Sequence, residues 1–112
     1  MTFDMSQKLM RIANYFNIGM TMFEVQESGN IRQYTLCRIE VNILSNEMMH
    51  IRFICENQSN GVNEYFSYED LDNGTLFIFE PMAQEQAAKN MVKYYGGVKD
   101  ENNIRNSSTL IL

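Results

Sequence analysis

Two cysteines and one histidine are the residues of this sequence that could support nucleophilic or metal chemistry. Cys37 and Cys55 lie on two consecutive predicted strands, and His50 lies on the second of them. Side chains alternate between the two faces of a strand, which places His50 opposite both cysteines and leaves it without a nucleophile to activate. No Cys-x-x-Cys pair indicates zinc. We therefore predict two buried thiols that behave as small apolar groups, with a cross-strand disulfide as the alternative.

Four carboxylates lie close together in the sequence, at Glu64, Glu69, Asp70 and Asp72. Paired carboxylates can act as acid and base or bind a hard cation, but this segment lacks the alternating ligand spacing of a calcium loop. The glycines are scattered among turns and form no phosphate-binding loop. The sequence thus predicts a protein that is not an enzyme and that holds neither a cofactor nor a metal.

A long hairpin from residue 31 to residue 56, folded about Asn46, positions most of these residues. Its apolar side chains pair across the two arms as Ile43 with Met49, Val41 with Ile51, Ile39 with Phe53 and Cys37 with Cys55. Its polar side pairs Asn42 with His50, Glu40 with Arg52, Arg38 with Ile54 and Leu36 with Glu56. A slip of one residue would exchange the two faces, so this register predicts one buried face and one outer face.

The hairpin is flanked by shorter elements. The apolar spacing predicts a helix over residues 3–16, with Asp4 as its N-cap and Gln7 completing a capping box. Strands are expected over 20–26, 62–68 and 76–79, and a second helix begins at Pro81 and ends before Gly96. The apolar stripe of the first helix would cover the sheet or form a dimer face.

We therefore expect an α+β fold, in which an antiparallel sheet of about five strands, curled or closed into a small barrel, carries an N-terminal and a C-terminal helix. Residues 1–97 would form the single domain, and residues 98–112 a polar tail with an apolar end. That end, Leu110, Ile111 and Leu112, either frays or docks onto a sheet edge of its own chain or of a neighbour, as an oligomer contact.

The outer face of the hairpin mixes aromatic, aliphatic and charged side chains, as binding surfaces do. Its candidate binding residues are Tyr34, Leu36, Arg38, Glu40, His50, Arg52 and Ile54. This face would either contact a partner or be covered by one of the two helices.

Composition narrows the classes of partner. The net charge is −5 and no Lys/Arg cluster is present, which argues against nucleic acid as a ligand, while the dispersed acidic residues do not form the runs of a DNA mimic. No apolar run approaches the length of a membrane span, and the first residues lack a signal-peptide pattern. We expect a cytoplasmic protein whose two cysteines stay reduced.

One stretch resembles a known class of proteins. The aromatic–acidic segment Tyr65-Phe66-Ser67-Tyr68-Glu69-Asp70-Leu71, followed by Leu76-Phe77 and the Ala-rich run Gln84 to Ala88, resembles small uncharacterised proteins of phages and prophages. Met22-Phe23-Glu24-Val25 is similar to their first strand. The sequence departs from them at Phe79-Glu80-Pro81, where a Thr or Ser cap is usual, and in its additional N-terminal helix. Some phage factors of similar architecture sequester nucleotide immune signals in oligomeric pockets.

Together, the residues and the resemblance predict a non-enzymatic, phage-like accessory protein that binds and blocks a host or viral partner and associates with itself. One alternative is an oligomeric sponge for a nucleotide-like signal, with Tyr or Phe rings stacking on the base and Arg38 or Arg52 binding phosphate. Another is a structural or assembly component of a phage particle.

Overall fold

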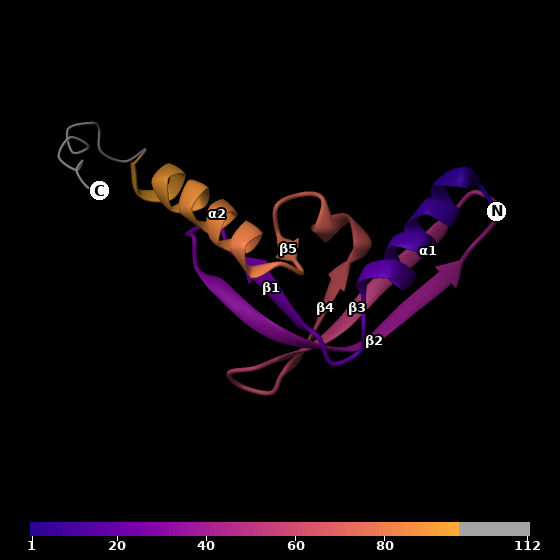
Figure 1. The fold of residues 1–112 in the computed structure, drawn as a ribbon, viewed down its shortest axis with the longest axis horizontal. Coiled ribbons are helices and arrows are strands. Elements are labelled where there is room, and N and C mark those ends of the chain that lie inside the picture. Colours follow the sequence, from indigo (N-terminus) through magenta and orange to yellow (C-terminus); the bar gives the residue numbers. More distant parts are fainter. Residues whose placement is uncertain (97–112) are drawn as a thin grey trace.

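The protein folds around one five-stranded antiparallel sheet with the strand order β4-β3-β2-β1-β5 (Figure 1). The computed structural model describes residues 1–96. The elements are α1 (Phe3–Tyr15), β1 (Thr21–Val25), β2 (Ile31–Ile43), β3 (Met49–Asn57), β4 (Asn63–Ser67), the short 3-10 helix η1 (Tyr68–Leu71), β5 (Leu76–Phe77), α2 (Glu80–Met91) and the π-helical turn η2 (Val92–Gly96). The predicted α+β architecture, with five strands between two helices, is confirmed, but the sheet is open and does not close into a barrel.

The predicted tail, residues 98–112, lies outside the described residues, and so do Leu110, Ile111 and Leu112. Among the described residues, no helix is long and apolar enough to cross a membrane.

The N-cap of helix α1 lies two residues before the predicted one. Thr2 is the N-cap, because its side-chain oxygen accepts a hydrogen bond of 3.1 Å from the backbone N–H of Met5. The predicted cap at Asp4 is therefore wrong, and Asp4 lies in the first turn, where a carboxylate is favourable next to the helix dipole. The predicted apolar stripe does cover the sheet: Met5 and Phe16 are buried, and the Phe16 ring stacks on Phe53 with 5.1 Å between ring centroids.

The register of the long hairpin is as predicted from Arg38↔Ile54 to Ile43↔Met49. Between Leu36 and Arg38 the ladder shifts, because Cys37 is an extra residue on β2 and forms a β-bulge. Leu36 therefore pairs with Cys55, and Thr35 pairs with Glu56. The predicted pairs Cys37–Cys55 and Leu36–Glu56 are wrong.

The bulge exchanges the faces of β2 on its N-terminal side. Tyr34 and Leu36, which were expected on the outer face, are fully buried in the core beneath α1, while Cys37, expected in the core, is exposed. Cys55 is buried as predicted, and both thiols are free.

Apolar clusters form on both faces of the sheet. Met22 of β1 packs beneath α1 with Phe53 and Leu36, whereas its neighbour Phe23 packs on the opposite face against Ala83 and other residues of α2. The two helices thus cover opposite faces at different ends of the sheet (Figure 1). As a result, a hollow remains where the C-terminal end of α1, the β5 segment and the start of α2 approach one another.

Candidate functional site

The seven candidate binding residues of the outer hairpin face do not form one surface. Tyr34 and Leu36 belong to the core, and Ile54 is only 3% exposed. Four of the seven, Arg38, Glu40, His50 and Arg52, keep side chains at the surface. These four residues therefore form a charged patch. The aromatic and aliphatic residues that were predicted to belong to the binding face are buried and not accessible.

Within this patch, one carboxylate holds two guanidinium groups. Glu40 accepts hydrogen bonds from Arg52 at 2.7 and 3.2 Å, and from Arg38 at 2.9 and 3.2 Å. The bonds from Arg52, and then those from Arg38, lower the pKa of Glu40. Arg52 also lies over the Tyr65 ring, 4.5 Å from its centroid. Both arginines thus already have anionic or aromatic partners.

Within the same patch, His50 lines a hollow with Arg52, Tyr65, Ser67 and Glu69. No hydrogen bond joins its ring to a Ser, Cys or carboxylate among residues 1–96. In the same range, no group of three or more His, Cys, Asp or Glu side chains could hold a metal ion. We find no arrangement there that could activate a nucleophile.

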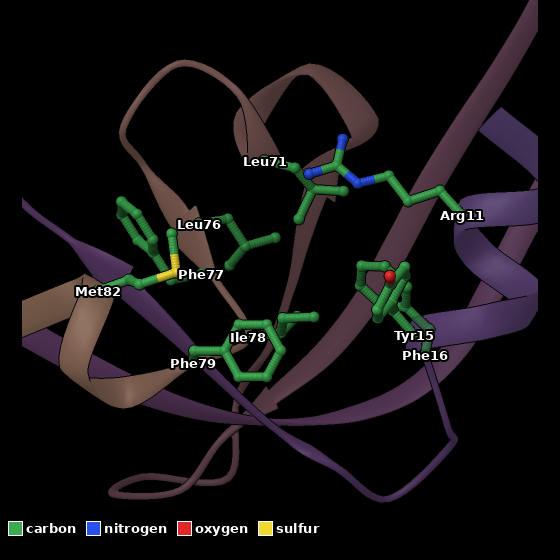
Figure 2. Close-up of a pocket in the computed structure, with 9 residues that line it drawn as sticks. All are labelled: Arg11, Tyr15, Phe16, Leu71, Leu76, Phe77, Ile78, Phe79 and Met82. Atoms are coloured by element: carbon green, nitrogen blue, oxygen red, sulfur yellow. The ribbon is translucent and has the colours of Figure 1, made fainter. Parts of the chain in front are cut away.

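A more enclosed cavity, which no sequence pattern indicated, lies between α1 and α2. We call it the α1–α2 pocket; its volume is about 300 Å³, at the lower end of the range of ligand pockets. It is lined by Arg11, Tyr15, Phe16, Leu71, Leu76, Phe77, Ile78, Phe79 and Met82. Figure 2 shows the α1 side chains on one side of the cavity and those of β5 and α2 on the other.

The floor and the rim of the α1–α2 pocket differ in exposure. Phe16 and Leu76 form a buried floor. At the rim, Tyr15, Phe79 and Met82 are 56%, 53% and 55% exposed. Large apolar side chains gathered around a concave apolar floor are typical of binding sites, whereas single exposed ones are common on any protein surface.

A guanidinium group is positioned at one end of the pocket. Nη1 of Arg11 donates to the Tyr68 hydroxyl at 3.2 Å and to both carboxylate oxygens of Asp72 at 3.1 and 3.2 Å. The hydrogen bond to Tyr68 is the main reason why the pKa of Arg11 is raised. All its hydrogen bonds to residues 1–96 run through Nη1, so the N–H groups on Nε and Nη2 remain available to a ligand.

Arg11 also connects the pocket to a second, more polar hollow along α1. Arg11 and Tyr15 line both, and the second hollow adds Asp4, Lys8 and Tyr68. Lys8 forms ion pairs with Asp4 at 3.5 Å and with Glu69 at 3.8 Å. The apolar pocket thus has a more polar hollow as its neighbour, and the two share Arg11 and Tyr15.

The sequence contained partial signals of this site. Tyr15 precedes Phe16 of the predicted apolar stripe without belonging to that stripe, and Phe79 and Met82 flank Pro81 at the start of the second helix. The sequence did not indicate that the end of α1 at Tyr15 and the start of α2 at Glu80, which are 65 residues apart, approach each other. Comparison with protein-family models, with curated proteins and with solved structures found no match to this chain.

Proposed function

We propose that this protein is a non-enzymatic binding protein that captures an apolar segment of a partner protein in the α1–α2 pocket. The observation that carries the proposal is the ring of exposed Tyr15, Phe79 and Met82 around a concave apolar floor. Buried aromatic and aliphatic anchors in such pockets contribute most of the binding energy of protein complexes. The free N–H groups of Arg11 would donate to a main-chain carbonyl or a carboxylate of the same segment.

Charge favours a protein segment over a nucleotide as the occupant. The Arg11 guanidinium is paired with Asp72, and Lys8 of the neighbouring polar hollow is paired with Asp4 and Glu69. On the hairpin, Glu40 already pairs with the two arginines expected to bind phosphate. A nucleotide would bring several negative charges to sites whose positive charges are compensated. The resemblance to phage and prophage proteins adds the expectation that the partner is a host or viral protein.

Two exposed methionines provide a matched test. Met82 lies at the rim of the pocket and is 55% exposed, whereas Met48 lies at the tip of the hairpin and is 53% exposed. We expect Met82→Glu to weaken capture of the partner at least tenfold, because a carboxylate would face the apolar floor, and Met48→Glu to leave capture unchanged. Affinity capture of the parent and both variants, with quantitative mass spectrometry of the bound proteins, measures the difference.

If the unchanged protein and Met82→Glu captured every retained protein in equal amounts, the pocket would not be the binding site. Native mass spectrometry of protein purified from cells, together with thermal shifts across a nucleotide panel, tests the sponge alternative. If a nucleotide were retained and then lost on substitution of Arg11, the occupant of the pocket would be a small ligand and not a protein segment.

A further inference from the structure

The outer edge of β2 has no neighbouring strand beyond the bulge. β1 pairs with β2 only over Ile31 to Thr35, and Leu36 completes this ladder by exchanging hydrogen bonds with Met20 and Gly19. From Arg38 to Ile43, no backbone hydrogen bond within residues 1–96 is made on that side. Unpaired strand edges bind other strands readily, and proteins usually protect them.

The hairpin ladder identifies which backbone groups face this edge. Leu44 donates its N–H to the carbonyl of Met48 at 2.9 Å, which makes 44/48 a hydrogen-bonded pair. Hydrogen-bonded and non-hydrogen-bonded pairs alternate along an antiparallel ladder. Asn42, Glu40 and Arg38 therefore bond to β3. The N–H and C=O groups of the intervening residues, Ile39, Val41 and Ile43, point outward at the open edge.

The side chains of the same three residues form an apolar row on the face covered by α1. They were predicted as core, and their partners Ile51 and Met49 are buried, but Val41 is 40% exposed and Ile43 is 56% exposed. The long side chains on the flank of α1, Lys8 and Arg11, point toward η1 instead. The edge thus combines free backbone groups with uncovered apolar side chains.

We propose that this edge pairs with the same edge of a second copy of the chain, in antiparallel register about a two-fold axis at Val41. This inference stands independently of the α1–α2 pocket. Val41 then faces Val41 of the second copy, and Ile39 faces Ile43. All three outward residues are hydrogen-bonded in this register, with about six hydrogen bonds across the axis. The two sheets become one continuous sheet, with an unbroken apolar row beside both α1 helices.

The charges are compatible with this register. Glu40 faces Asn42 of the second copy, and Arg38 faces Leu44, so no like charges are opposed. An axis at Glu40 would place two carboxylates opposite each other, which is unfavourable. An axis at Ile39 would bring Ile43 against Thr35, whose outer side is covered by β1.

The other edges of the sheet are less suited to such pairing. β5 has only two residues. β4 has five, and the N–H of its last residue, Ser67, is already bonded to Asp70 at 3.0 Å. The open edge of β2 is the longest in the part of the chain that the structure describes.

The solution mass of the full-length protein tests the proposal. Sedimentation equilibrium should give twice the chain mass of 13.1 kDa at micromolar concentration. Val41→Lys would place two lysines opposite each other at the axis, and we expect it to raise the dimer dissociation constant at least tenfold. Asn63→Lys, on the edge of β4, is the matched control and should leave the dimer intact. Val41→Pro removes one outward N–H without breaking the hairpin ladder, and should act like Val41→Lys.

Disulfide cross-linking tests the register. In a Cys37→Ser background, Val41→Cys should cross-link two chains on mild oxidation, since residues paired across such an axis have Cα atoms about 5.5 Å apart. Ile43→Cys should not, because the two copies of position 43 would be about 14 Å apart. A monomer at all concentrations, a dimer that survives Val41→Lys, or cross-linking of Ile43→Cys alone would each overturn the proposal.

Discussion

Leu36 tests which face of the long hairpin is buried, because the regular register predicted it on the outer face and the structure has it in the core. Leu36 is fully buried beneath α1, whereas its neighbour beyond the bulge, Arg38, is exposed. We expect Leu36→Ala to lower the free energy of unfolding by about 2–5 kcal/mol, through lost burial and the remaining cavity. Arg38→Ala should cost about 0.5 kcal/mol or less, since it removes only a surface ion pair. Urea denaturation of both variants measures these changes, and similar small losses would place Leu36 outside the core.

The two thiols should differ in reactivity, because one is exposed and the other is buried. Cys37 is exposed at the bulge, whereas Cys55 is fully buried and its burial raises the pKa of the thiol to about 12. Because the thiolate is the reactive form, a thiol reagent at pH 8 should label one residue in the native protein and two in denaturant. Mass spectrometry of the labelled peptides identifies the residue, and labelling of Cys55 before unfolding would contradict the burial.

At the scale of elements, the bulge on β2 makes an unusual prediction about deletions. Without Cys37, the pairs Leu36↔Cys55 and Arg38↔Ile54 would be adjacent in a regular ladder, with every side chain on its present face. We expect this deletion to fold, with a loss within about 2 kcal/mol. Deletion of Thr35 should cost more, because Tyr34 and Leu36 would become neighbours and could not both face the core. Equal losses in urea denaturation would argue against Cys37 as the inserted residue.

The sequence contained a signal of this bulge, which was missed because the prediction assumed a regular ladder along the whole hairpin. Tyr34 and Leu36 alternate in one phase, and Ile39, Val41 and Ile43 alternate in the other. One inserted residue between the two groups places all five on one face, as the structure has it. The hairpin pairs nearest the turn were predictable because their apolar and polar patterns agree on both arms. The exposure of Val41 and Ile43 was not predictable from the sequence, because it depends on which strands α1 covers.

The α2 helix should depend on a glycine in a turn that contacts it. Gly29 has φ of +97°, and a Cβ there would lie 2.8 Å from the carbonyl oxygen of Ala87 and 3.0 Å from Cβ of Met91. Gly19 has a similar φ of +94° but nothing within 4 Å. Gly19→Ala should therefore cost about 1–2 kcal/mol for backbone strain alone, and Gly29→Ala about 1–3 kcal/mol more for the clash. Thermal unfolding, with amide exchange in α2, measures the difference. Equal losses of stability in the two variants would show that α2 shifts to accommodate the added Cβ without cost.

For the whole molecule, two acidic groups in one core predict how stability depends on pH. Burial raises the pKa of both Tyr34 and Cys55 to about 12, and the Tyr34 hydroxyl also donates to Glu24 at 2.9 Å. In the unfolded chain, these groups ionise near pH 10 and pH 9. Since the folded state keeps both protons, the unfolded state alone loses them, and stability falls as pH rises from 9 toward 12.

The slope of this fall separates the two groups. Each should lower the free energy of unfolding by about 1.4 kcal/mol per pH unit above its unfolded pKa. The parent should therefore lose stability from about pH 9, and Cys55→Ala only from about pH 10, whatever the absolute stability of the variant. Urea denaturation at intervals between pH 7 and 10.5 measures both curves, with Cys37→Ala as the control for loss of a thiol. If the parent and Cys55→Ala decline in parallel from pH 9, the buried thiol does not set the alkaline limit of the fold.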